Sequence, residues 1–106
     1  MKIYNLEVLD NFKKKHAQSR KKLDLWKCRI EENEYKTPNE LADFFKYSNL
    51  SEGLVVFKDN NDYRIVACLN YERQSLFIKE ILTHETYNEV KLKEKYNCLI
   101  ICHTKS

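Results

Sequence analysis

The chain has 106 residues, close to the usual size of a single domain, and its 42% hydrophobic and 33% charged residues exclude a disordered tail. A single glycine cannot build a glycine-rich phosphate loop, which excludes the nucleotide-binding folds that depend on one. The formal net charge is +3, and seven Lys and Arg side chains fall within residues 1–22, whereas residues 23–60 are net acidic. This basic segment fits RNA phosphates, an acidic protein or a solvated helix face equally well.

The N-terminal residues lack the apolar stretch of a secretory signal, and no segment approaches the ~20 apolar residues of a membrane span. We therefore expect a cytoplasmic protein with reduced thiols, in which Cys28 and Cys68 are small buried side chains. Cys98 and Cys102, followed by His103, resemble metal spacing only faintly, because no second close pair of ligands exists. The sequence predicts neither a metal site nor a cofactor.

The first third of the chain predicts a short strand and two amphipathic helices. Residues 2–5 are short and β-prone. From Leu6 the apolar spacing becomes helical, and two stripes follow with charged residues on the opposite faces. The stripes consist of Leu6, Leu9, Phe12, Leu23, Trp26 and Ile30. The short polar turn between them predicts an antiparallel helix pair.

A third, short helix is predicted to start at Thr37. Pro38 is tolerated at the first helical position, and Glu40 completes a capping box with Thr37. We expect this helix to carry Phe44 and Phe45, and a polar connection to follow it. The aromatic side chains predicted to lie in the core are Phe12, Trp26, Phe44, Phe45 and Phe57.

The second half predicts a three-stranded antiparallel meander over residues 54–57, 63–70 and 76–82, with polar turns between the strands. Thr83 is predicted to cap a short C-terminal helix with Glu85 in its first turn. The apolar end of the chain is an added strand or a partner-binding segment. The fold class is therefore α+β: a short N-terminal strand, two to three helices packed on an antiparallel β-meander, and a short C-terminal helix.

Several segments then occur in a recognisable order. They are Trp26, Lys36-Thr37-Pro38, Val55-Val56-Phe57, Tyr63-Arg64-Ile65-Val66, Phe77-Ile78-Lys79 and Thr83-His84-x-x-Tyr87. In this order and spacing, residues 1–93 resemble the HigB family of toxins, in the RelE superfamily. The resemblance implies one RelE-like domain over residues 1–106, in which residues 97–106 form an atypical C-terminal extension.

The resemblance also implies a function. HigB-like proteins are the toxins of type II toxin–antitoxin systems and cleave mRNA on the ribosome, which inhibits translation. The expected enzyme is a metal-independent endoribonuclease, or mRNA interferase, that works in the cytoplasm. Its expected partners are mRNA, the ribosome and a HigA-like helix-turn-helix antitoxin, and the resemblance implies a heterotetramer of toxin and antitoxin.

Four residues are candidates for the chemistry. His84 is the candidate acid or base, because the ordinary pKa of a histidine side chain lies near neutrality. Tyr87, one helical turn later, is expected to stack on a base or to donate a proton. Arg64 and Lys79, on adjacent strands, are candidates for phosphate contact. The expected RNA-binding residues are Arg73, Lys13, Lys14, Lys15, Lys21 and Lys22.

Each candidate has a plain structural alternative. His84 could be an exposed residue at the start of a helix, Tyr87 a packing residue, and Arg64 and Lys79 the solvent face of a sheet. Two other functions also fit the residues. One is an RNA- or ribosome-binding module without catalysis, and the other is a protein-interaction domain that binds through the apolar residues 99–101.

Overall fold

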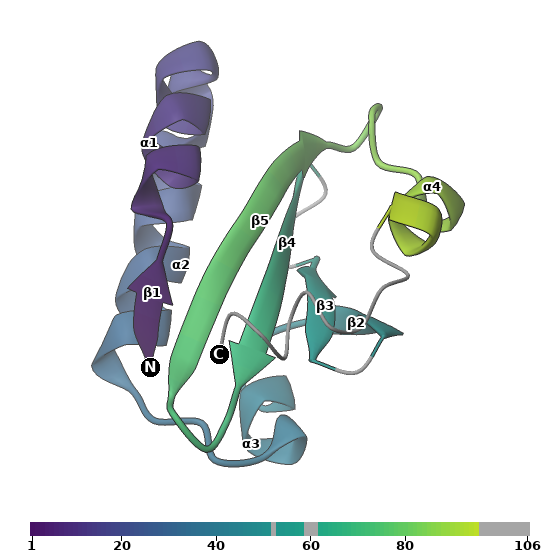
Figure 1. Ribbon diagram of the computed structural model, residues 1–106. Coiled ribbons are helices and arrows are strands. Elements are labelled where there is room, and N and C mark those ends of the chain that lie inside the picture. Colours follow the sequence, from purple (N-terminus) through teal and green to yellow (C-terminus); the bar gives the residue numbers. More distant parts are fainter. Residues whose placement is uncertain (52, 59–61, 96–106) are drawn as a thin grey trace.

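In the computed structural model, residues 1–51, 53–58 and 62–95 are described, and they form one sheet with helices on both faces (Figure 1). The strand order is β1-β5-β4-β3-β2. β1 pairs parallel with β5, and the other neighbouring strands are antiparallel. The bounds are β1 Lys2–Tyr4, β2 Tyr47–Ser51, β3 Leu54–Phe57, β4 Tyr63–Asn70 and β5 Ser75–Thr83. The predicted α+β class and its meander β3-β4-β5 are confirmed.

The predicted helix pair covers one face of the sheet. α1 spans Leu6–Lys15, a short 3-10 turn spans Ala17–Ser19, and α2 spans Arg20–Glu32. The apolar stripes point at the sheet because burying such side chains stabilises the fold by about 1.5–3 kcal/mol each. The buried stripe residues are Leu9, Leu23, Trp26 and Ile30, while Leu6 and Phe12 pack partly buried against the same core.

α3 (Pro38–Ala42) has the predicted capping box, in which the N–H of Glu40 donates to Thr37 Oγ1 at 3.2 Å. The helix ends sooner than expected, and this corrects the core prediction. Phe45 is 4% exposed, but Phe44 is 55% exposed. Once the helix has ended, the chain turns towards the sheet, so two consecutive side chains point in different directions.

β2 was missed, because its segment Tyr-Ser-Asn-Leu-Ser was expected to be a polar connection. This sequence has little intrinsic strand preference. It becomes a strand through its backbone pairing with β3 at one edge of the sheet. Tertiary pairing therefore decided its conformation.

The second face of the sheet packs against α4 (Glu89–Lys95). The small cluster there consists of Leu54, Val56, Val66, Cys68 and Leu92. The predicted start of this helix is wrong. Thr83 is the last residue of β5, a turn follows it, and Asn88 Oδ1 accepts a hydrogen bond from the N–H of Lys91 at 3.1 Å in the first turn of α4.

β5 contains a bulge that the sequence pattern did not predict. Opposite Val66 and Ala67 of β4, the pairing shifts from Glu80 to Ile78, so Lys79 is the extra residue. Lys79 and Glu80 therefore both point towards the α4 face: Lys79 Nζ lies 4.8 Å from the Phe77 ring centroid, and Glu80 pairs with Lys95 of α4.

Two expectations about cysteines are corrected. Cys28 is an exposed free thiol rather than a buried side chain. Cys68 is buried as expected, but it is disulfide-bonded rather than reduced. The expectations for the chain end (97–106), which includes Cys98, Cys102 and His103, lie outside the described residues. Within the described part of the chain, no helix has the length and apolar character needed to span a membrane.

Candidate functional site on the α4 face

The ring of Tyr87 lies beside two cations on the α4 face of the sheet. Arg64 Cζ and Lys58 Nζ are each 5.7 Å from the centroid of its ring. The ring packs partly buried against the cluster that contains Leu92, and the hydroxyl oxygen is buried. Contacts of this kind stabilise by roughly 0.5–1 kcal/mol at exposed sites, and the face of the ring attracts positive charge. The arrangement concentrates positive charge around an aromatic surface.

Arg64 reaches this position through β4. Its neighbour Tyr63 packs edge-on against Phe12 of α1, with ring centroids 5.3 Å apart. Because successive side chains of a strand point to opposite faces, Arg64 points to the α4 face. Its Nη1 donates to the carbonyl of Tyr63 at 3.1 Å, which restrains the guanidinium group. A restrained, planar guanidinium group is well suited to two-point contact with phosphate oxygens.

Lys79 lies on the same face, on the strand next to Arg64 as expected. It is not level with Arg64, because Arg64 pairs with Leu82 and Lys79 lies at the bulge further along β5. Glu80 beside it is ion-paired with Lys95 at 2.9 Å, which ties α4 to the sheet. The structure therefore brings Arg64 and Tyr87 into contact and leaves Lys79 at the margin of this site.

His84 is exposed at the end of β5. His84 and Tyr87 lie in one hydrogen-bonded turn, in which the carbonyl of Thr83 accepts from the N–H of Tyr87 at 3.0 Å, but this turn is separate from α4, which begins only at Glu89. The backbone N–H of His84 donates to the carbonyl of Asp62 at 2.8 Å. The hydrogen bond from Lys22 is the main reason why the pKa of Asp62 is lowered, and the His84 ring nearby also favours the ionised form of the Asp62 carboxyl group.

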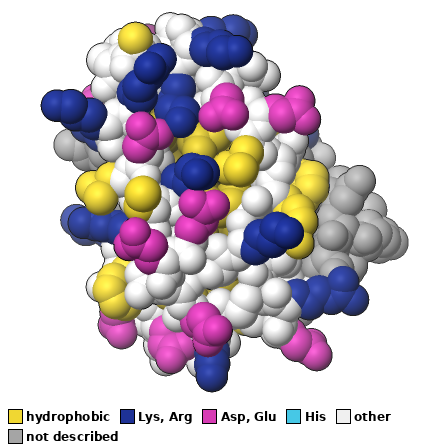
Figure 2. Space-filling model, turned by 90° about the vertical axis from the view of Figure 1, so that its left-hand side faces the viewer, with side chains coloured by type: hydrophobic (Ala, Val, Ile, Leu, Met, Phe, Trp, Pro, Cys, Tyr) yellow, Lys and Arg dark blue, Asp and Glu magenta, His cyan; other side chains and the backbone are white. Residues whose placement is uncertain are grey.

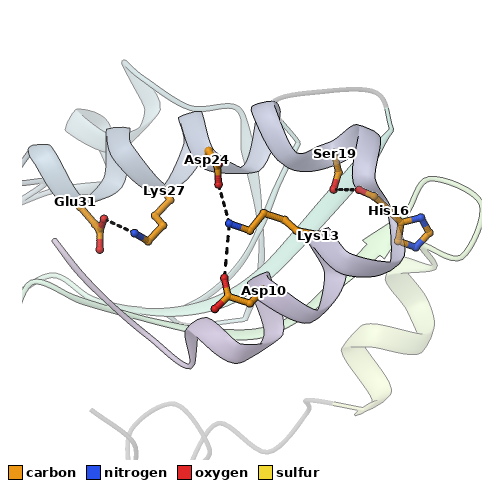
Figure 3. Close-up of polar contacts among 7 residues, drawn as sticks. All are labelled: Asp10, Lys13, His16, Ser19, Asp24, Lys27 and Glu31. Carbon is orange, nitrogen blue, oxygen red and sulfur yellow. Dashed lines mark hydrogen bonds and ion pairs between the residues drawn. The ribbon is translucent and has the colours of Figure 1, made fainter.

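The predicted RNA-binding lysines of the helix pair divide into two groups. Lys13 is only 17% exposed and lies 2.7 Å from Asp24 and 3.6 Å from Asp10, so it joins α1 to α2 (Figure 3). Lys22 pairs with Asp62 at 2.8 Å. By contrast, three lysines are exposed and make no ion pair with any residue that the structure describes: Lys14, Lys15 and Lys21.

These exposed lysines lie near the turn between α1 and α2. The helix pair lies on the opposite side of the sheet from α4 (Figure 1). Figure 2 shows that Lys and Arg side chains are more frequent in the upper part of the helix face and acidic ones in the lower part. Arg73 is exposed in the β4–β5 turn. The nine residues of β5, which span roughly 30 Å, separate Arg73 from His84. The predicted RNA-binding residues therefore do not form one patch.

Lys58 was missed at the sequence level. It adjoins Phe57, an aromatic residue that packs on the helix-pair face. Where a predicted strand ends in an aromatic residue next to a cationic one, the two side chains point to opposite faces of the sheet. A buried aromatic side chain therefore indicates that the cation beside it lies on the other face. Tyr63-Arg64 has the same pattern, and only this pair was recognised.

A mixed sheet with a helix pair on one face and a small cationic, aromatic site on the other is compatible with the RelE-like α+β class. The sequence model of one protein family, described as HigB_toxin, the RelE-like toxic component of a toxin–antitoxin system, matches residues 19–90. This match covers more than half of the chain, and the chain belongs to the HigB_toxin family. A search of curated proteins finds no match. As the toxin of such a system, the protein has an antitoxin partner.

Proposed function

We propose that this toxin is a metal-independent endoribonuclease that cleaves mRNA on the ribosome and so inhibits translation. The observation that carries the proposal is the pair of cations, Arg64 and Lys58, against the ring of Tyr87 on the α4 face of the sheet. Cleavage of an RNA chain builds negative charge on the phosphate, and fixed cations stabilise that charge. An aromatic ring beside them offers a stacking surface for a base.

In the proposed reaction, the ribose 2′-oxygen attacks the adjacent phosphorus while the bond from phosphorus to the 5′-oxygen breaks. A base takes the proton of the 2′-hydroxyl, and an acid gives a proton to the leaving 5′-oxygen. The products are a cyclic phosphate and a 5′-hydroxyl. Arg64 neutralises the phosphate, and exposed His84 transfers a proton. The ring of Tyr87 stacks on a nucleobase of the RNA. Lys79 and Arg73 contact more distant parts of the RNA.

The exposed lysines of the helix pair are proposed to bind ribosomal or messenger RNA backbone on the other side of the sheet. Lys14, Lys15 and Lys21 are suited to this role because their ammonium groups are exposed. Lys13 and Lys22 contribute less, since carboxylates already neutralise them. We further propose that the protein works in the cytoplasm and that its antitoxin is a HigA-like helix-turn-helix protein, the two assembling as a heterotetramer.

The test is to map mRNA ends by primer extension in a translating extract. We expect wild type to cut translated mRNA, and Arg64→Gln to reduce cutting by about 100-fold, the typical cost of losing one group that stabilises developing charge. His84→Ala is expected to reduce it by about 100-fold or more. Glu85→Ala, an exposed neighbour of His84, is the matched control, and thermal unfolding verifies that each variant is folded.

The outcomes separate the hypotheses. If both variants are folded and cut as wild type does, these residues are not the site. If folded wild type binds RNA with strong salt dependence but never cuts it, the protein is a binding module. If it binds neither RNA nor ribosomes and binds only a protein partner, it is an interaction domain.

A further inference from the structure

Asp62 and His84 stand directly opposite each other where β4 and β5 reach one end of the sheet. Within the strands, the last pair at this end is Tyr63 with Thr83. One residue further out, the backbone N–H of His84 donates to the carbonyl of Asp62 at 2.8 Å, which extends the antiparallel register by one step. Directly opposite residues have Cβ atoms about 4.5–5.5 Å apart on the same face. The Asp62 carboxylate therefore lies beside the His84 ring, in agreement with the electrostatic effect of His84 on it.

The backbone of His84 is held on both sides. The hydrogen bond to Asp62 ties it to the end of β4. In the turn that follows, Thr86 Oγ1 accepts from the N–H of Thr83 at 3.1 Å and lies 3.0 Å from Thr83 Oγ1. With the backbone fixed in this way, the ring of His84 can move mainly by changing rotamer. A charged neighbour then has a direct influence on where the ring points.

Asp62 is anchored to the helix pair by Lys22. Lys22 Nζ donates to Asp62 Oδ2 at 2.8 Å, and this hydrogen bond is the main reason why the pKa of Asp62 is lowered. Asp62 is therefore ionised at neutral pH and does not compete with His84 for a proton. A carboxylate beside an imidazole orients the ring and stabilises the imidazolium ion that forms when the ring accepts a proton. The exposure of Asp62 and the charge of Lys22 reduce this effect, so we expect a modest contribution.

We propose that Asp62 is a positioning residue that orients His84 to act as the base for the ribose 2′-hydroxyl. This proposal rests on the proposed function, which assigns proton transfer to His84. The proton moves from the 2′-oxygen to an imidazole nitrogen while the 2′-oxygen bonds to phosphorus and the bond from phosphorus to the 5′-oxygen breaks. The leaving oxygen takes a proton from water, and His84 returns its proton to the solvent afterwards. Asp62 stays ionised throughout.

The experiment measures single-turnover cleavage of mRNA on purified translating ribosomes at a series of toxin concentrations. Asp62→Asn is expected to lower the maximal rate by about 10-fold, a part of the about 100-fold or more that proton transfer contributes. The half-saturating toxin concentration should stay unchanged, because Asp62 acts through His84 rather than on the RNA. Asp62→Glu keeps the charge and is expected to restore the maximal rate to within a few-fold of wild type.

A double-mutant cycle then tests whether Asp62 acts through His84. In the His84→Ala background, Asp62→Asn is expected to have no further effect on the maximal rate. The control is Asp43→Asn, which removes an exposed carboxylate at the end of α3 and should match wild type. Thermal unfolding verifies that each variant is folded.

The outcomes distinguish this inference from the proposed function. If folded Asp62→Asn cuts at the wild-type rate while His84→Ala has lost its activity, the positioning role is wrong and the ribonuclease proposal stands. The same conclusion follows if Asp62→Asn costs as much in the His84→Ala background as in wild type, or if it changes only the half-saturating concentration. Folded His84→Ala that cuts as wild type does overturns the role of His84 and this inference with it. Wild type that cuts no mRNA overturns both proposals.

Discussion

The guanidinium carbon of Arg64 lies 5.7 Å from the centroid of the Tyr87 ring, although Arg64 belongs to β4 and Tyr87 to the segment between β5 and α4. The contact brings a phosphate-binding group and a stacking surface to one point on the sheet. The hydroxyl oxygen of Tyr87 is buried, so the ring rather than the hydroxyl group faces the proposed RNA site.

Tyr87→Phe is therefore expected to keep cleavage within a few-fold of wild type, because it preserves the ring. Tyr87→Leu is expected to reduce cleavage by about 5- to 150-fold, since stacking of one base on an aromatic side chain is worth roughly 1–3 kcal/mol. Mapping of mRNA ends in a translating extract measures both. If Tyr87→Phe loses as much activity as Tyr87→Leu, the hydroxyl group takes part in proton transfer instead.

The ion pair between Lys22 and Asp62 predicts a window of pH for its contribution to stability. The hydrogen bond between them lowers the pKa of Asp62 below 3.8 and raises the pKa of Lys22 above 10.5. The contribution of Asp62 is therefore complete above pH 3.8 and is lost as the pH falls through its lowered pKa. The contribution of Lys22 is complete below pH 10.5 and is lost as the pH rises through its raised pKa.

Melting midpoints of wild type and Asp62→Asn measured against pH verify this window. We expect wild type to be slightly more stable at neutral pH, because exposed ion pairs contribute little. The difference should disappear in strong acid and strong base. Asp43→Asn, which removes an exposed carboxylate of α3's C-terminal end, is the control and should show no such window. A difference that persists in strong acid contradicts the assignment to Asp62.

Phe44 and Phe45 form a matched pair for testing the end of α3. Phe45→Ala is expected to lower the free energy of unfolding by about 3–5 kcal/mol, because it empties a site in the core. Phe44→Ala is expected to change it by about 0.5 kcal/mol, since that side chain is mostly exposed. Urea unfolding measures both values. Equal losses would mean that Phe44 is a core residue, as the sequence pattern predicted.

Gln74 joins the β4–β5 turn to the segment before α3. Its side-chain oxygen accepts from the N–H of Tyr35 at 2.9 Å, and its nitrogen donates to the carbonyl of Tyr35 at 2.7 Å. Gln74→Ala is expected to cost roughly 2–6 kcal/mol, because two backbone groups of a fully buried residue lose their partner at about 1–3 kcal/mol each. Unfolding in urea measures the loss.

Gln74→Gly separates two effects at this turn. Gln74 has a φ of 51°, in the left-handed region. Glycine adopts this conformation without the clash of a Cβ atom, so Gln74→Gly should be about 1 kcal/mol more stable than Gln74→Ala. If the two variants are equally stable, the conformation contributes no strain. If both match wild type, the hydrogen bonds to Tyr35 do not stabilise the fold.

The sequence by itself determined the elements that depend on local spacing. The stripe through Leu9, Leu23, Trp26 and Ile30 predicted the helix pair, and Thr37 with Glu40 predicted the start of α3. Alternating residues predicted the meander, and the ordered segments predicted the family. The helix pair, the start of α3 and the meander are encoded by residues close together in the chain, and the family by the order of segments along it, so a single sequence suffices to find them.

Only the tertiary structure decided the elements that depend on pairing between distant segments. β2 is a strand because β3 offers it a partner, and the bulge at Lys79 exists because β4 sets the register of β5. The register of β3 against β4 likewise brings Lys58 beside Arg64. Register is a relation between strands rather than a property of one segment, and for this reason the sequence predicted Arg64 and Tyr87 singly while the fold placed them together.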